Sequence, residues 1–152
     1  MTRASAFGLV AAVMIGGTAC KAGKATGHLE AKGTLGAWTL DSGTCYSGQR
    51  EQYFGAIAYG PDKSGIGVKV AKDPVKGWTA IVNIAATCAN EAEKGGCRAL
   101  ILTADVCKTF DIEIANTNTT VNDIIEVEGH VNLDCKTDDY ELHGQLALDS
   151  CH

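Results

Sequence analysis

The sequence has 152 residues, of which 45% are hydrophobic and 20% are charged, with a formal net charge of −5 at pH 7. That length and composition exclude a disordered chain and leave too little sequence for two domains of typical size. Residues 101–152 carry two Lys or Arg against eleven Asp or Glu, which argues against nucleic acid or anionic headgroups as partners of that region. A cation or a basic protein would suit it, unless the carboxylates only solvate the outward faces of strands.

The first twenty residues have the layout of a secretory signal. Arg3 gives a positive start, residues 4–15 are mostly apolar, and small residues precede Cys20. The apolar run is shorter than the roughly 20 residues that span a bilayer. Residues 1–19 are therefore predicted to be a signal peptide and not a transmembrane helix.

The end of this segment, Gly17-Thr18-Ala19-Cys20, resembles the lipobox of bacterial lipoproteins, although Gly17 stands where the pattern usually has Leu. The resemblance implies that Cys20 receives diacylglycerol and becomes the new N-terminus. The membrane would then be a partner through the lipid, and the protein would lie in the bacterial cell envelope, at the outer membrane or cell surface and not free in the periplasm. Ordinary signal-peptide cleavage is the alternative, because Gly17 and Ala19 also satisfy the small-x-small rule.

Cysteine arithmetic favours the lipid. If Cys20 is lipidated, the other six cysteines are an even number that can all pair in the oxidising space beyond the inner membrane. From the order of the strands, the pairings expected first are Cys45–Cys151, Cys88–Cys97 and Cys107–Cys135. No Cys-x-x-Cys occurs, so neither a thioredoxin-like redox centre nor a zinc ribbon is supported.

Residues 20–27 contain no large apolar side chain and are predicted to form a flexible tether. Residues 28–152 then have the pattern of an all-β domain. Short apolar or alternating segments, separated by Gly, Asp, Asn and Pro, predict about eight strands. These segments lie within 28–40, 53–59, 66–71, 78–85, 100–102, 110–114, 125–135 and 140–148.

The last two segments predict a β-hairpin with one buried face. Strict alternation places Val131 and Leu133 on the face that should be buried, and Asn132 on the face that should be exposed. This hairpin is the best-defined part of the predicted sheet.

His130 and His143 fall on the outward face of the hairpin. A loop at 136–139 would place Asn132 opposite His143, with His130 diagonally across at about 7–8 Å between backbones. Together with Asp134, the two imidazoles could hold zinc or copper, so a metal-dependent protein or enzyme is the alternative function. Two exposed histidines on a polar strand face would give the same pattern, and no cofactor is predicted.

Tyr46, Arg50 and Tyr53 belong to the most aromatic stretch of the chain. Tyrosine with arginine is typical of a binding hot spot, so these residues are candidates for contact with a protein or a small ligand. Core packing of the rings and solvation of Arg50 would explain them equally. No Gly-x-Ser-x-Gly, His-Glu-x-x-His or phosphate-binding glycine loop occurs, so no catalytic residue is proposed and the protein is predicted not to be an enzyme.

The lipid anchor, an early strand with Cys45, about eight strands and a terminal Cys151 are similar in layout to LpqH-type mycobacterial lipoprotein antigens. The expected fold is a single antiparallel β-sandwich or flattened barrel of about eight strands, stapled by disulfides. The expected protein is a cell-envelope lipoprotein with a non-catalytic binding or structural role.

Overall fold

The computed structural model describes residues 22–34, 36–60, 67–83 and 99–152. These residues form nine strands and two short 3-10 helices. The elements in chain order are β1 (Gly23–Gly33), β2 (Gly36–Ser47), η1 (Gly48–Glu51), β3 (Gly55–Tyr59), β4 (Gly67–Asp73), β5 (Gly77–Asn83), β6 (Ala99–Leu102), η2 (Ala104–Val106), β7 (Cys107–Val121), β8 (Ile124–Lys136) and β9 (Tyr140–Cys151).

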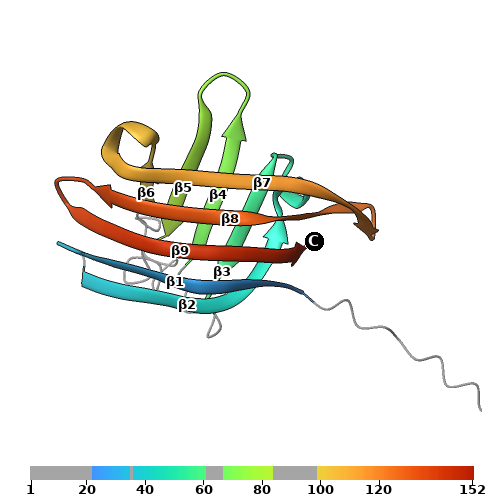
Figure 1. Cartoon of the computed structure of the whole chain (residues 1–152), viewed down its shortest axis with the longest axis horizontal. Coiled ribbons are helices and arrows are strands. Elements are labelled where there is room, and N and C mark those ends of the chain that lie inside the picture. The colour runs from blue at the N-terminus through green and yellow to red at the C-terminus, as the bar shows by residue number, and fades with distance from the viewer. Residues whose placement is uncertain (1–21, 35, 61–66, 84–98) are drawn as a thin grey trace, which may run out of the picture.

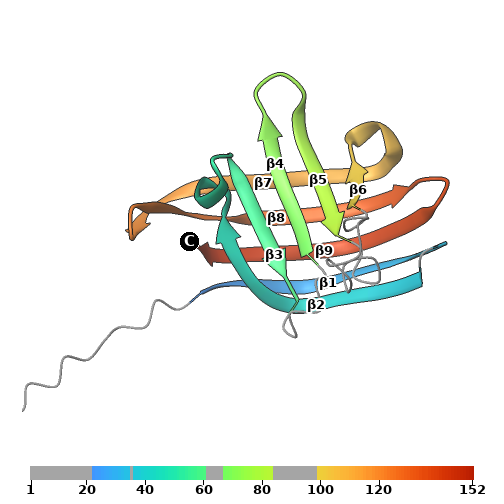
Figure 2. The same ribbon diagram turned by 180° about the vertical axis from the view of Figure 1, so that it is seen from behind.

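The strands form one antiparallel sheet in the order β6-β5-β4-β3-β2-β1-β9-β8-β7. The sheet curls into a half-barrel, so that β3, β4 and β5 cross behind β7, β8 and β9 at a steep angle (Figure 1), and the view from behind shows the same crossing (Figure 2). The all-β prediction is confirmed, with nine strands in place of about eight. A sandwich of two sheets is not confirmed, because the last residues of β2, Thr44–Ser47, pair with β3 and the ladder continues where the sheet turns.

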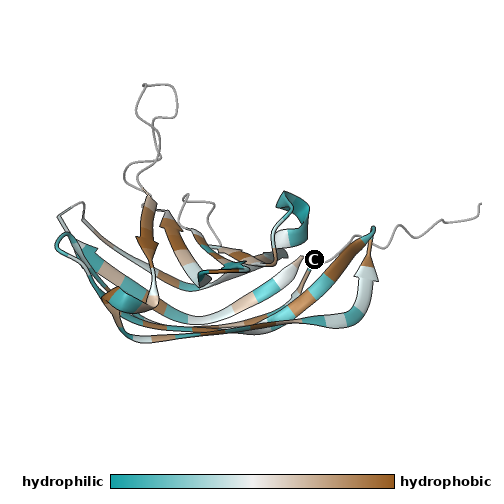
Figure 3. Cartoon of the chain, turned by 90° about the horizontal axis from the view of Figure 1, so that it is seen from above, coloured by the Kyte–Doolittle hydropathy of each residue, from teal (hydrophilic) through white to brown (hydrophobic). Residues whose placement is uncertain are grey.

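One face of the sheet, here called the core face, carries the hydrophobic core, and the opposite face is called the outer face. Polar and apolar bands alternate along the long strands (Figure 3), as the period of two requires. On β8 and β9, Val131, Leu133, Leu142 and Leu146 are each 1% exposed, whereas Asn132 is only half-buried. The predicted buried face of the hairpin is therefore confirmed.

Two disulfides join strands of this core. Cys45 on β2 is bonded to Cys151 at the end of β9, and Cys107 on β7 is bonded to Cys135 on β8. Both pairings agree with the prediction. The third predicted pairing, Cys88–Cys97, lies outside the described residues.

The predicted tether is wrong from Gly23 onward. Residues 23–27 form the first half of β1, which pairs with β2 on one side and β9 on the other. Small residues are needed there because the neighbouring backbones approach closely: a Cβ atom at Gly23 would overlap the carbonyl oxygen of Ser150, and Ala25 is completely buried. The lack of large side chains indicates tight packing here and not flexibility.

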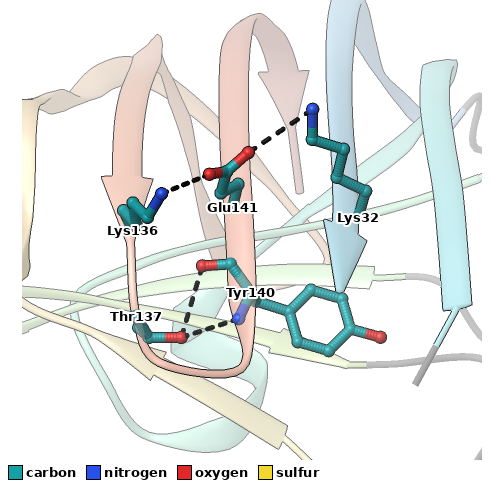
Figure 4. Close-up of polar contacts among 5 residues, drawn as sticks. All are labelled: Lys32, Lys136, Thr137, Tyr140 and Glu141. Carbon is teal, nitrogen blue, oxygen red and sulfur yellow. Dashed lines mark hydrogen bonds and ion pairs between the residues drawn. The ribbon is translucent and has the colours of Figure 1, made fainter. Parts of the chain in front are cut away.

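The turn between β8 and β9 is shorter than the predicted loop at 136–139. The Thr137 amide donates to the Tyr140 carbonyl oxygen at 2.7 Å. The Thr137 hydroxyl accepts a hydrogen bond from the Tyr140 amide at 3.0 Å and donates one to the Tyr140 carbonyl oxygen at 3.3 Å (Figure 4). The ladder continues to the pair Lys136 and Glu141, so only residues 137–139 make the turn. The pairing of the two strands is consequently displaced from the predicted register.

A charge ladder crosses the sheet beside this turn. Glu141 lies between Lys136, at 2.5 Å, and Lys32, at 3.4 Å (Figure 4). Hydrogen bonding to Lys136 first, and to Lys32 second, lowers the pKa of the Glu141 carboxyl. The same carboxylate raises the pKa of Lys136. All three side chains are exposed enough for solvent to screen them, so the ladder fixes register more than it adds stability.

Candidate functional site

The helix η1 follows β2 and is held from several directions. The Ser47 hydroxyl accepts a hydrogen bond from the Gln49 amide at the start of the helix, and Gln52 ends the helix in the left-handed conformation, with φ of 64°. The Gln49 side chain reaches the β7–β8 turn, where its Oε1 accepts from the Ile125 amide at 2.7 Å and its Nε2 donates to the Asp123 carbonyl oxygen at 3.4 Å. This short helix is therefore part of the rigid sheet.

Six side chains around η1 and the outer face of β2, β3 and β4 form what we call the tyrosine–cation cluster. Its members are Tyr46, Arg50, Glu51, Tyr53, Tyr59 and Lys69. The guanidinium carbon of Arg50 lies 5.2 Å from the centre of the Tyr46 ring, and the Tyr46 and Tyr59 rings meet edge to face at 6.1 Å. Both distances fit attractive cation–π and aromatic contacts.

The second cation of the cluster, Lys69, makes two contacts. Its Nζ lies 4.0 Å from the centre of the Tyr53 ring and 2.8 Å from Glu51 Oε2. The other side of Tyr53 packs on Gly48, where a Cβ atom would overlap the ring. The three residues predicted to bind a partner, Tyr46, Arg50 and Tyr53, lie next to one helix, with Tyr46 and Arg50 in direct contact.

The cluster borders two hollows. One, of about 290 Å³, is lined by Tyr46, Arg50, Glu51 and Tyr59, with Ser47 and Ile57 completing its wall. The other, of about 300 Å³, lies between η1 and the ends of β7 and β8. Both are the size of small binding pockets and are open to solvent.

Burial marks two of the tyrosines. Desolvation raises the pKa of the Tyr59 hydroxyl, and it raises that of Tyr53 above its usual range, so both phenols stay neutral at physiological pH. Tyr53 lines the second hollow, but its hydroxyl is buried and has no hydrogen-bond partner within the described residues. A buried hydroxyl without a partner costs about 1–3 kcal/mol.

The predicted metal site is not assembled. On the β8–β9 ladder, His143 lies opposite Asp134 and not opposite Asn132 as predicted, and His130 lies opposite Ala147. The two histidines are thus four residues apart along the sheet, or about 13 Å. Within the described residues, no group of three His, Cys, Asp or Glu side chains is placed to hold a metal ion. The shorter turn is the physical cause, because it displaces β9 by two residues.

Each histidine of the outer face contacts carboxylates instead. His130 Nε2 lies 3.1 Å from Asp111, and His143 Nε2 contacts Glu30 on β1. His28 continues the second pair, with its Nε2 at 3.8 Å from Glu30 and its Nδ1 at 2.5 Å from Asp41. We call the run Asp41–His28–Glu30–His143 the histidine–carboxylate ladder.

Sequence patterns did not predict this ladder, because no local pattern shows that β1, which carries His28 and Glu30, pairs with β9. The i, i+2 spacing of His28 and Glu30 was the available signal. The hydrogen bond with Asp41 raises the pKa of His28 above that of an isolated imidazole. His28 is therefore the side chain of this ladder whose proton binding the neighbouring carboxylate favours.

The fold class is therefore a curled, disulfide-linked antiparallel sheet that carries a fixed aromatic surface. No protein-family model, curated protein or solved structure matches this chain. Among the described residues, no helix is both long and apolar enough to cross a membrane.

Proposed function

We propose that the protein is a lipoprotein of the bacterial cell envelope, anchored through lipid on Cys20, and that it binds a partner without catalysis through the tyrosine–cation cluster. The anchor rests on the lipobox-like sequence before Cys20. The binding role rests on one observation above all: Arg50 is stacked on Tyr46 beside an open hollow, on a helix that cannot move independently of the sheet.

Rigid aromatic side chains are effective contact residues because little conformational entropy is lost when they are covered. Tyr46 and Tyr59 are held against one another, and Lys69 is oriented by Glu51 and Tyr53. The partner would find these side chains already in position. Two cations beside one carboxylate favour a partner whose contacting groups are polar or anionic and lie next to apolar surface.

The disulfide between Cys45 and Cys151 supports the same interpretation. Cys45 directly precedes Tyr46, so the bridge fixes the end of β2 from which the cluster is built. A structural role alone would not require the exposed Arg50 to lie against the Tyr46 ring, whereas a binding surface benefits from both the contact and its fixed geometry.

Site-specific photocrosslinking in cells of the native envelope would test the proposal. A photoreactive phenylalanine analogue at position 59, which keeps an aromatic ring in the wall of the hollow, should give a discrete adduct with one partner. The matched control is the same analogue at Thr39, which is exposed on the strand that carries Tyr46, about 23 Å from Tyr46 along the strand. Arg50→Ala, combined with the analogue at position 59, should weaken the adduct strongly. Equal adducts at positions 59 and 39, or none at either, would contradict the binding role.

A further inference from the structure

The edge strand β7 is the longest strand of the sheet and is open on one side. It has 15 residues and, within the described chain, pairs only with β8. The other edge of the sheet, β6, has four residues. In Figure 1, β7 is the uppermost strand of the front layer, and no other labelled strand of that layer lies above it.

The central part of β7 is a regular template for another strand. Thr109 to Asn116 pair with β8 in unbroken register, from Asp134 to Val127. In an antiparallel ladder, alternate residues direct their N–H and C=O groups to one neighbour, so about half of these backbone groups point away from β8. Such a row of free groups can receive an additional strand.

Charge identifies what kind of strand would fit. Residues 109–135, which include this template and most of β8, contain six Asp or Glu and no Lys or Arg. Asp111 and Glu113 lie exposed on β7 itself. A second copy of this chain would bring the same acidic stretch against itself, which like-charge repulsion disfavours. A segment with Lys or Arg on its outward face is attracted.

The core-facing side of this edge favours apolar residues in an added strand. Ile112 and Ile114, each 7% exposed, belong to the core, and Phe110 is only partly buried, so the core extends to the free edge at β7. An added strand would place alternate side chains over this edge of the core. Its apolar residues would extend the core, while its basic residues would lie beside Asp111 and Glu113.

We propose that the free edge of β7, from Thr109 to Asn116, binds an extended peptide segment in which basic and apolar residues alternate, by addition of that segment as a further strand. Backbone hydrogen bonds would join the peptide to β7. The alternation of apolar and basic residues would decide which side of the peptide faces the core, and the acidic outer face would favour peptides with basic side chains. This surface is distinct from the tyrosine–cation cluster and does not depend on it.

The probe is a capped, fluorescently labelled peptide of sequence Lys-Val-Lys-Val-Lys-Val-Lys, titrated with the full protein while fluorescence anisotropy is recorded. Binding should be saturable, and hydrogen exchange should slow at the amides of residues 109–116 that point away from β8. A peptide with an N-methyl group at every residue keeps the charge but has no backbone N–H donor on either edge, and it should lose the binding. A peptide with Glu in place of Lys should not bind.

Glu113→Lys should weaken binding of the Lys-Val peptide about tenfold, because it turns an attraction into a repulsion at the contact. Asp41→Lys is the matched control, since it changes the net charge equally on β2, four strands away, and should change the affinity less than twofold. Circular dichroism would establish that both variants fold. Equal binding of the N-methylated peptide, an equal effect of both variants, or no binding at all would overturn the proposal. Without peptide, protection that rises with protein concentration at the amides of residues 109–116 that point away from β8 would also overturn it, because a second copy would then be the occupant.

Discussion

Replacing Cys45 and Cys151 together by alanine should destabilise the protein more than replacing Cys107 and Cys135. The first bridge joins residues 106 apart in sequence, and the second joins residues 28 apart. In the chain-entropy model, a bridge stabilises by restricting the unfolded chain, and the restriction grows with the logarithm of the loop length. The model gives about 4.7 kcal/mol for the longer loop and about 3.6 kcal/mol for the shorter one. The short bridge lies inside the long loop, which reduces their difference by a few tenths of a kcal/mol.

Alanine at both positions avoids a leftover thiol or a buried hydroxyl, since Cys45 and Cys151 are completely buried. Urea unfolding followed by circular dichroism would give the free energy of unfolding of each double variant. For a chain of this size, the loss of the longer bridge should lower Tm by on the order of 15 °C. Equal losses from the two double variants, or a larger loss from Cys107→Ala with Cys135→Ala, would refute the entropic argument. Packing at the bridges would then be the dominant contribution.

Three further outcomes are expected. Cys20→Ser should move the protein from the membrane fraction to the soluble fraction without unfolding it, as fractionation and circular dichroism would establish; a variant that stays with the membrane would exclude the lipid anchor. Val131→Asp should lower the free energy of unfolding by several kcal/mol, because an unpaired carboxylate would enter the core. Asn132→Asp should lower it by less than about 1 kcal/mol. Similar losses from the two variants in chemical unfolding would mean that the strand has no buried face. Because Asp41 raises the pKa of His28, the proton bound to His28 stabilises the fold below pH 6.5, and this contribution disappears as the pH rises through the folded-state pKa. His28→Gln should therefore lower Tm at pH 5.5 and leave it nearly unchanged at pH 8. An equal loss of Tm at both pH values would exclude the protonation effect.

Alternation along the last two strands was enough to predict which side chains are buried. Val131 and Leu133 occupy the core face because a strand presents every second residue to the same side, and this property is local. The two disulfides were also predictable from the order of the strands, because each bridge joins residues near the ends of two strands. The nine-stranded half-barrel was not predictable, since no local pattern indicates that the end of β2 pairs with β3 as well as with β1.

The candidate sites show more clearly which features sequence patterns could not predict. Tyr46 and Arg50 are close in sequence, and composition was enough to name them as binding candidates, but it did not predict their contact. The bond from Gln49 to Ile125 joins residues 76 apart, and no sequence pattern predicts it. The histidine positions were known, but their neighbours depend on the exact length of a turn, and an error of two residues changed the neighbour of His143 from Asn132 to Asp134.

The early start of β1 restricts how a lipid anchor could present the protein. Only three residue steps separate Cys20 from Gly23, a span of at most about 10 Å. Gly23 pairs with Cys45, at the end of β2 that continues into η1, so the tyrosine–cation cluster would lie close to the headgroups. The turn at residues 137–139 lies at the other end of β9, about 35 Å away, and would point outward. An anchored molecule would have little freedom to tumble: partners of η1 would approach within the plane of the membrane, and the acidic far turn would meet whatever arrives from the surrounding space.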